Sequence, residues 1–361
     1  VQQEQTAAID GYTRGSMRIL IVSSLEQPYT TGSRYTGIER LAAQLSGELA
    51  KLGQDVTLLA HKDTLISETV RLLPWGGYTE SNKSIYSEMQ AYQQYQAEFY
   101  KFDVMIDFSH WHLIGRFMVN RPIVSITWNS PQTGQYPKAP YNLICLSNWA
   151  VRDWFRFTHQ QARYQETIMV DPEVYHPEGI RIERFLTIGR MAPEKGNLNA
   201  ALLSKELGLP LDIAGGRGTE VSAGNTLSDY EKEILSLCDG KQIVFHGEVS
   251  EEEKLRLMRT CKSLIYITNH IEPTSHKIQE SMFCGAPIIA PDHGGIPEIV
   301  THGADGFLCR TQQEYIEAIR NVDKLDPSKT HDKIVNKYKP ETVAKGYLVL
   351  MEQVANGLRW K

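Results

Sequence analysis

Residues 185–196 read FLTIGRMAPEKG and decide the fold of the second half of the chain. The first four residues have the length and apolar character of a buried strand in a parallel sheet. Gly189 ends this strand, and the cations Arg190 and Lys195 follow in a loop. Ligands of open α/β sheets bind at the carboxyl ends of the strands. We therefore expect an α/β unit here, with a ligand site in the loop.

Strands and helices are expected to alternate in both halves of the chain. Residues 19–22 (ILIV) predict a buried strand, residues 38–52 a helix with leucines at helical spacing, and residues 55–60 the next strand. Further strands are expected at residues 104–106, 123–126, 142–146, 211–214, 243–246, 264–267 and 287–290, with helices between them such as 251–261. This alternation predicts an α/β fold of two doubly wound parallel sheets.

Length and composition narrow the class of protein. With 361 residues and 41% apolar content, the chain is long enough for two domains. A net charge of -5 gives no basic excess for binding nucleic acid, so no nucleic-acid partner is expected. No apolar run approaches the roughly 18 residues of a membrane span, which favours a cytoplasmic location. The five cysteines form no CxxC pair, so neither disulfides nor a zinc site are expected.

These patterns predict the following domain boundaries. The tail has apolar residues at helical spacing, which suits a helix that crosses back onto the first lobe. We expect an expression remnant at residues 1–16, an N-terminal Rossmann-like lobe at 17–170, a proline-bearing linker at 171–178, a second Rossmann-like lobe at 179–338 and a C-terminal helix at 339–361.

Two carboxylates, Glu272 and Glu280, frame the segment EPTSHKIQE. Pro273 or Thr274 is expected to open a helix, which would leave the amides of residues 275–277 unpaired at its positive end. A diphosphate is favoured there. Eight residues advance about 800° in a helix, so both carboxylates would lie on one face and could accept hydrogen bonds from a sugar and a ribose. The simpler alternative is a charged helix with a capping proline.

The loop after residues 185–188 suits the same ligand. Gly189 lets the backbone approach a phosphate, and Arg190 and Lys195 can neutralise a diphosphate leaving group. Solvated loop cations are the alternative. A second glycine-rich loop, residues 215–218 (GGRG), lacks the GxGxxG spacing of a dinucleotide site, and a plain turn is its alternative.

Several motifs in the same order resemble one known family, the retaining glycosyltransferase family 4 (glycosyltransferase group 1), which has the GT-B fold. The resemblance covers nearly the whole chain from Met17. It rests on residues 190–196 (RMAPEKG), the frame 272–280, residues 285–287 (GAP), residues 294–300 (GGIPEIV), Gly303, Gly306, residues 37–39 (GIE) and the segment 170–177.

The resemblance implies two Rossmann-like lobes that face a central cleft, an acceptor lobe first and a donor lobe second. It implies that Arg190 and Lys195 hold the donor diphosphate. Glu280 would bind the ribose and Glu272 the donor sugar. His110 is similar to the family's first-lobe histidine that reaches the reacting sugar, although the preceding segment must absorb about one extra residue to align.

Backbone groups complete the site that the resemblance implies. Amides of Ser275, His276, Lys277 and Gly37 would add to the phosphate site, and the loop at Gly215 would lie near the nucleotide. The family usually has Phe-Gly where this chain has Thr274-Ser275, and two glycines where it has Thr36-Gly37. Bulkier side chains at these places would narrow the donor pocket, so the donor stays open.

The expected function is therefore retaining transfer of a hexose from a UDP- or GDP-sugar to a carbohydrate, lipid-linked or small-molecule acceptor. No Asp-x-Asp occurs, so no metal and no cofactor are expected, the nucleotide sugar being a substrate. Alternatives are an inverting transferase or epimerase of GT-B form, or a catalytically silent nucleotide-sugar-binding protein. Residues 149–157 predict a helix packed by its Trp and Phe side chains with exposed arginines, and peripheral membrane contact is the alternative. The oligomeric state stays open.

Overall fold

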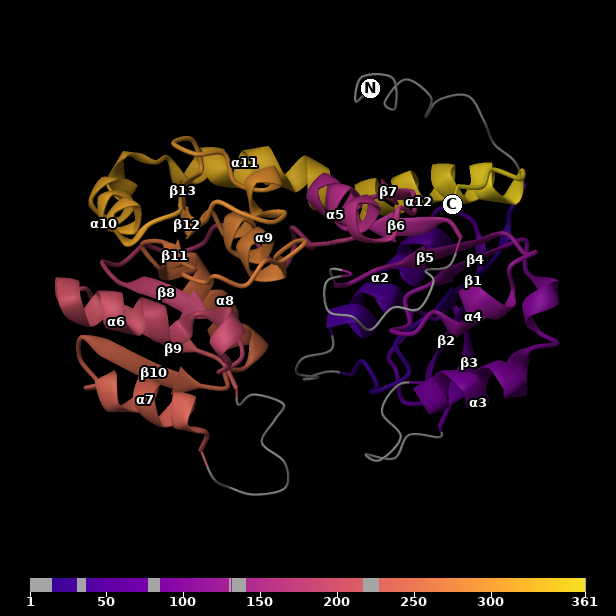
Figure 1. Cartoon of the computed structure of the whole chain (residues 1–361), viewed down its shortest axis with the longest axis horizontal. Helices are drawn as coiled ribbons and strands as arrows, with labels where there is room; N and C mark the ends of the chain where they lie inside the picture. The colour runs from indigo at the N-terminus through magenta and orange to yellow at the C-terminus, as the bar shows by residue number, and fades with distance from the viewer. Residues whose placement is uncertain are drawn as a thin grey trace. The chain divides into compact units, whose positions relative to one another are not determined.

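The computed structural model describes residues 15–30, 37–76, 85–129, 131, 141–216 and 227–360. Most of the expected remnant (1–14), Thr36, and Arg217 and Gly218 of the glycine-rich loop lie outside the described residues. The chain divides into two compact units (Figure 1). Unit 1 is Val1–Met169 with Pro340–Lys361, and unit 2 is Val170–Lys339.

Unit 1 is built on a seven-stranded parallel sheet with the order β3-β2-β1-β4-β5-β6-β7. At the centre of the sheet, Ile21 of β1 lies opposite Leu58 of β2 on one side and Ile106 of β4 on the other. The strands are β1 (Arg18–Val22), β2 (Asp55–His61), β3 (Arg71–Trp75), β4 (Val104–Asp107), β5 (Ile123–Ile126), β6 (Leu143–Cys145) and β7 (Ala162–Tyr164). The order reverses between β1 and β4, which is where α/β sheets open a crevice for ligands.

Helices cover both faces of this sheet. On one face, β1, β4 and β5 pack against α3, α4 and the short helix η1 through side chains such as Leu20, Met105 and Ile114. On the other face, α2 contacts β1, β2 and α12, with Leu41, Leu45 and other residues at helical spacing buried. The helices are α2 (Gly37–Lys51), α3 (Ile85–Tyr95), η1 (Phe99–Lys101), α4 (Leu113–Phe117), α5 (Asn148–Thr158) and α12 (Pro340–Ala355).

The C-terminal helix α12 belongs to unit 1, as expected from its apolar spacing. It contacts α2, β4 and β5, and Tyr347 Oη lies 2.7 Å from Thr167 Oγ1. Beyond the helix, the Trp360 indole donates to the Leu143 carbonyl at 3.0 Å, and the Trp360 amide donates to Asn142 Oδ1 at 3.0 Å. The Arg163 guanidinium lies over the Trp360 ring. The last residues of the chain therefore extend the core of the first sheet.

Helix α5 differs in part from its prediction. Trp154 is buried at its inner face, as expected. Phe155 and Phe157, which were expected to pack inward, are 54% and 49% exposed. Phe155 lies one residue, or about 100°, around the helix from Trp154, and Phe157 lies in the last turn, just before α5 ends at Thr158. The packing prediction is therefore wrong for both phenylalanines.

Unit 2 is built on a six-stranded parallel sheet with the order β10-β9-β8-β11-β12-β13, which reverses between β8 and β11. The strands are β8 (Phe185–Ile188), β9 (Leu211–Ala214), β10 (Ile243–Gly247), β11 (Leu264–Ile265), β12 (Ile288–Pro291) and β13 (Gly306–Cys309). The helices are η3 (Pro193–Lys195), α6 (Asn197–Leu207), α7 (Asp229–Leu237), α8 (Glu251–Thr260), α9 (His276–Phe283), η4 (Ile296–Glu298), α10 (Gln312–Asn321), η5 (Val322–Lys324) and α11 (Pro327–Tyr338).

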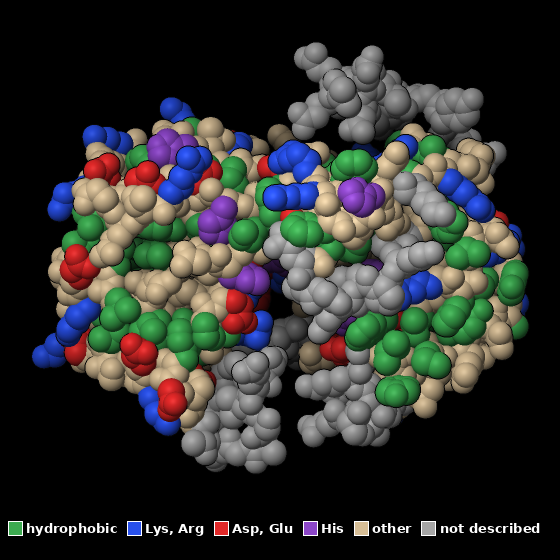
Figure 2. Space-filling model, in the orientation of Figure 1, with side chains coloured by type: hydrophobic (Ala, Val, Ile, Leu, Met, Phe, Trp, Pro, Cys, Tyr) green, Lys and Arg blue, Asp and Glu red, His purple; other side chains and the backbone are tan. Residues whose placement is uncertain are grey.

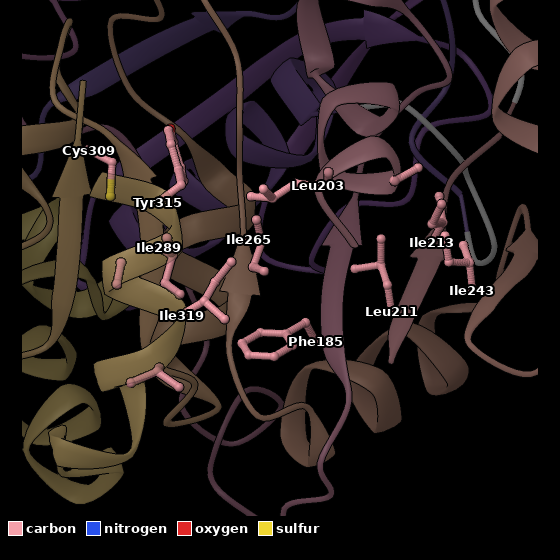
Figure 3. Packing of buried hydrophobic residues seen from close by; sticks show 14 of the residues in the cluster. Phe185, Leu203, Leu211, Ile213, Ile243, Ile265, Ile289, Cys309, Tyr315 and Ile319 are labelled. Carbon is pink, nitrogen blue, oxygen red and sulfur yellow. The ribbon is translucent and has the colours of Figure 1, made fainter. Parts of the chain in front are cut away.

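One face of this sheet forms the main core of unit 2. Figure 3 shows Phe185, Leu211 and Ile265 of three strands pointing toward Leu203 of α6 and Ile319 of α10. Helix α9 packs against α8 and α11, and it also contacts β12. Strands β8 and β9 are buried along their whole length, so both faces of the sheet are covered. Together with unit 1, this confirms the predicted α/β class with two parallel sheets.

The described surface carries mixed charges. Figure 2 shows Lys and Arg side chains dispersed among Asp and Glu on one face of each unit. None of the described helices combines the length and apolar content that crossing a membrane would need. The expected cytoplasmic location and the alternative of peripheral membrane contact stay predictions.

Candidate functional site

The candidate site of unit 2 lies where its sheet order reverses. The loop after β8 carries Gly189, Arg190 and Lys195, and the loop after β11 carries Glu272 and leads into α9. Since β8 and β11 are neighbours whose connections leave in opposite directions, these two loops meet at the carboxyl edge of the sheet. The sequence predicted a ligand site in the first of these loops, at the carboxyl end of a strand; it did not predict that the Glu272 loop lies beside it.

Close backbone contact locks the two loops together. Gly196 has a φ of 71°, and a Cβ at this position would lie 2.0 Å from the Ile267 carbonyl oxygen. The Thr268 hydroxyl donates to the Glu194 carbonyl at 2.9 Å. Asn197 adds a hydrogen bond from its side-chain amide to the Arg190 carbonyl at 2.8 Å. Only glycine fits the closest approach, so Gly196 sets the distance between the loops.

A pair of glycines, Gly189 and Gly215, brings the loop after β9 to the site. Gly215 has a φ of 156°, and a Cβ there would lie 1.8 Å from the Gly189 carbonyl oxygen. The Met191 amide donates to the Gly216 carbonyl at 2.9 Å. Gly189 itself has a φ of 151°, and a Cβ added there would lie no closer than 3.6 Å to another atom, so there is room for a ligand atom beside its Cα. Gly189 and Gly215, both predicted donor-binding residues, thus lie in contact.

Lys195 and Glu272 form an ion pair in the site, with Nζ 2.5 Å from Oε1. Burial favours the neutral form of Glu272, yet the charges of Lys195 and Lys277 outweigh it and hold the pKa of this carboxyl below its usual range. The backbone of Glu272 is fixed as well, because the Gly295 amide donates to its carbonyl at 2.9 Å. The Glu272 carboxylate is therefore charged, and it is held beside Lys195, the cation predicted to bind the diphosphate.

The expected common helix face of Glu272 and Glu280 is wrong. Helix α9 begins at His276, with Ser275 as its N-cap, so Glu272 precedes the helix in an irregular segment. Proline disfavours helical backbone in the residue before it, which here is Glu272. Ser275, His276 and Lys277 still form the start of α9, where first-turn amides have no partner within the helix. The predicted anion position at this terminus is retained.

Glu280 lies within α9, and two polar groups hold it. Lys254 Nζ lies 3.4 Å from Glu280 Oε2, and the Tyr175 hydroxyl lies 3.2 Å from Oε1. Lys254 also donates to Tyr175 Oη at 2.7 Å. Tyr175 comes from residues 171–178, which were expected as a linker and here belong to unit 2. The carboxylate is 6% exposed, and its role toward a ribose stays a prediction.

Arg190, the other predicted cation, pairs with a near neighbour in the chain. Its Nη2 lies 3.2 Å from Glu194 Oε1, four residues later. The two side chains are 28% and 35% exposed, and an ion pair at such a partly exposed position adds little stability. Arg190 and Lys195 thus come from the same short loop, as predicted, and both meet a carboxylate.

The predicted residues of unit 1 lie at its own reversal point, between β1 and β4. His110 follows β4, and its Nε2 lies 3.9 Å from Glu26 Oε2 in the loop after β1. Burial lowers the pKa of His110, opposed by the Glu26 charge, so the ring favours its neutral form. Gly37 is the first residue of α2, and in the same turn burial raises the pKa of Glu39 to about 7.

The described residues contain no group of three or more His, Cys, Asp or Glu side chains that could hold a metal ion. In particular, His112 is not the second ligand of a site with His110. It is buried with a φ of 50°, and its Nδ1 lies 4.0 Å from Asp107 Oδ1. Independence of a metal stays a prediction.

Residues 181–339 match the family described as glycosyl transferases group 1. This match covers nearly all of unit 2. A probable sucrose-phosphate synthase of Thermosipho melanesiensis is 30% identical over 131 residues, which are 34% of this chain and 31% of that protein. The aligned part thus spans less than a third of that relative's length.

Solved structures share the two-unit fold. A sucrose-phosphate synthase from Thermosynechococcus elongatus has a TM-score of 0.77 at 17% identity, over 95% of this chain and 100% of that one. Anabaena HepE in complex with UDP and glucose has a TM-score of 0.67 at 16% identity, over 93% of this chain and 99% of that one. At these identities the likeness shows the fold, and the predicted GT-B fold is confirmed.

A cavity beside the loops after β8 and β9 was missed by sequence reasoning. It has a volume of about 380 Å³ and lies next to Gly215 at the strand ends. Met191, Ile234 and Phe245 give it apolar walls, and Glu248 adds a carboxylate. These residues lie on three separate segments, so no local motif could have revealed it.

Two buried carboxylates that position the His110 loop were also missed. Glu88 of α3 accepts the amides of Trp111 at 2.8 Å and Leu113 at 3.2 Å. Asp107 accepts the Ser109 hydroxyl at 2.6 Å. Burial, with the Asp107 charge, raises the pKa of Glu88 to about 8. Its place in an otherwise polar helix gave no signal in the sequence.

Proposed function

We propose that this chain is a hexosyltransferase that moves a sugar from a UDP- or GDP-sugar to a hydroxyl acceptor and retains the anomeric configuration. One observation carries the proposal: Gly189, Arg190, Lys195, Glu272 and the start of α9 converge at the reversal point of the second sheet. Open glycine backbone, cations and a helix N-terminus are the groups that a diphosphate needs. The family match of residues 181–339 supports the same chemistry.

Each group has a distinct task in the proposed reaction. Arg190, Lys195 and the α9 amides stabilise the charge that grows on the diphosphate as the bond to the sugar breaks. Glu272 faces the donor sugar, and the apolar cavity next to Gly215 receives the base. The acceptor hydroxyl attacks from the face that the diphosphate leaves, and a phosphate oxygen takes its proton. Two observations support these roles: the charge of Glu272 and the position of the cavity.

Donor turnover tests this function. The protein is incubated with UDP- and GDP-hexoses and with sugar acceptors, and release of the nucleotide is followed. Lys195→Ala should lower kcat/KM by about 100-fold to 1,000-fold, as loss of one transition-state cation does. Lys205→Gln removes a charge from an exposed position of α6 in the same unit and should leave the rate unchanged.

The product distinguishes the alternatives. NMR of the new linkage should show the donor's anomeric configuration, and an inverted product would refute the retaining reaction. A changed sugar without transfer would indicate an epimerase. Tight donor binding with no turnover would indicate a silent binding protein. The rate should be the same with and without EDTA, because cations and helix amides take the place of a metal.

A further inference from the structure

Lys277 is a cation in an unfavourable place. Its Nζ atom is buried and has no hydrogen-bond partner among the described residues. It is the second residue of α9, where the helix dipole repels positive charge. Lys195 adds repulsion of like charge. An isolated buried charge is costly, so such an arrangement indicates a missing anion.

The position of Nζ identifies where that anion would lie. Nζ lies 3.3 Å from the centre of the Tyr266 ring. A Cβ added to Gly189 would lie 3.6 Å from Lys277 Nζ and 3.6 Å from Lys195 Cβ. The open side of the Gly189 backbone is therefore bordered by two lysines. An oxygen atom placed there would lie at contact distance from the Lys277 ammonium group and beside the aliphatic stem of Lys195.

We propose that the ammonium group of Lys277 binds the diphosphate of the donor, as a third cation beside Arg190 and Lys195. This inference rests on the proposed function, because it takes the nucleoside diphosphate as the ligand. It assigns a role to the Lys277 side chain, whereas the sequence motif implied only its backbone amide. The helix terminus, the open glycine and the buried ammonium then serve one ligand.

The proposal implies that Lys277 takes up a proton when the diphosphate binds. Burial lowers the pKa of Lys277 to about 7, opposed by attraction to Glu272 and assisted by repulsion from Lys195. The Tyr266 ring and the start of α9 are the other groups that face it. A diphosphate adds negative charge at contact distance and raises this pKa. At pH 8 the amine of the empty protein is mostly neutral, so it takes one proton from solvent as the diphosphate binds.

Calorimetric titration with UDP and GDP measures this proton. At pH 8 the nucleotide is fully ionised, since a terminal phosphate has a pKa of about 6. Titrations in HEPES and Tris, which differ in ionisation enthalpy, should give an uptake of about 0.9 proton for a group with a pKa of about 7. The Kd should rise up to about tenfold for each pH unit above 7.

Two variants separate the charge of Lys277 from its bulk. Lys277→Met keeps most of the length of the side chain without its charge. It should weaken binding of UDP or GDP, whichever the wild type binds more tightly, about 10-fold to 100-fold, with no proton uptake. Lys277→Arg is permanently charged and should bind with no uptake. Lys205→Gln should match the wild type. Circular dichroism confirms that each variant is folded.

The outcomes distinguish the two proposals. Equal Kd and equal uptake for wild type and Lys277→Met would overturn the role of Lys277 and leave the proposed function intact. Binding without uptake in the wild type would overturn it as well. If neither UDP nor GDP binds to folded wild-type protein, the proposed function and this inference both fail.

Discussion

Single residues in unit 2 concentrate opposite charges in a small volume. Lys195 and Glu272 lie 2.5 Å apart, while Lys277 has attraction to Glu272 without a hydrogen bond. A buried ion pair adds little net stability, because losing water costs about as much as the attraction returns. Lys277 is attracted to Glu272 but forms no hydrogen bond with the described residues that would compensate for the loss of water. We infer that the empty site is a locally unstable part of the folded unit.

Replacing Lys277 by Met should therefore stabilise the empty protein. The folded state holds the Lys277 proton only to a pH of about 7, whereas the unfolded chain holds it to a pH of about 10.5. The unfolded state binds more protons between these values, so the wild-type free energy of unfolding rises with pH through this window. The advantage of Lys277→Met should thus shrink from pH 6.5 to pH 8.5, on the order of 1–2 kcal/mol.

Urea unfolding at the two pH values, without nucleotide, checks this expectation. Lys205→Gln serves as the control, because its exposed charge should give no pH-dependent difference. An advantage that grew with pH would contradict the burial of a charged Lys277.

At the scale of elements, the site depends on contact between loops that follow different strands. Gly196 and Gly208 both have positive φ values, 71° and 66°. Gly208 ends α6 with open space around the position of a Cβ, whereas a Cβ on Gly196 would overlap the Ile267 carbonyl. The two glycines thus share a backbone conformation and differ in packing.

Gly196→Ala should cost far more stability than Gly208→Ala. The control replacement carries only the strain of a left-handed alanine, about 1–2 kcal/mol. Gly196→Ala must also push the two loops apart, for which we expect a total above about 3 kcal/mol and a large loss of donor turnover. Thermal unfolding and donor turnover of both variants measure the difference. Equal losses would mean that the loops tolerate separation.

The sequence revealed the elements whose signals are local. Residues 185–188, 211–214 and 123–126 match β8, β9 and β5 residue for residue. Strand β3 was missed because Pro74 argues against a strand, although an edge strand tolerates proline. Strand β7 was missed because it has three residues and is only partly buried. Short edge strands depend on their neighbours more than on their own composition.

The candidate site could be predicted where motif and strand end coincide. The spacing of RMAPEKG after a strand was enough to place Arg190 and Lys195 in one loop. The link between Tyr175, Lys254 and Glu280 joins three segments and left no pattern in the sequence. The same holds for the Lys277 side chain, because its proposed role depends on its position beside the Tyr266 ring and Gly189. Contacts between distant segments are what local periodicity cannot supply.

At the scale of the whole molecule, residues 340–361 pack onto unit 1, although the rest of that unit is residues 1–169. Helix α12 follows all of unit 2 in sequence, yet it packs on unit 1. Tyr347 and Met351 of this helix are fully buried, and Trp360 bonds to both Asn142 and Leu143. The first sheet therefore packs against residues that lie far from its strands in sequence, which makes the folding of unit 1 depend on contacts between distant segments.

Met351→Ala should destabilise unit 1 selectively. Loss of a buried methionine side chain costs about 2–5 kcal/mol when the cavity cannot collapse, and Met351 has no exposed surface. Calorimetric unfolding should show a lower unfolding temperature for unit 1, while the unfolding temperature of unit 2 (residues 170–339) stays unchanged. Gln353→Ala, at an exposed position of the same helix, is the control and should move neither transition. Because Arg190, Lys195 and the start of α9 all lie in unit 2, UDP or GDP should raise the unfolding temperature of unit 2 in this variant. A fall of both transitions by the same amount would contradict the assignment of α12 to unit 1.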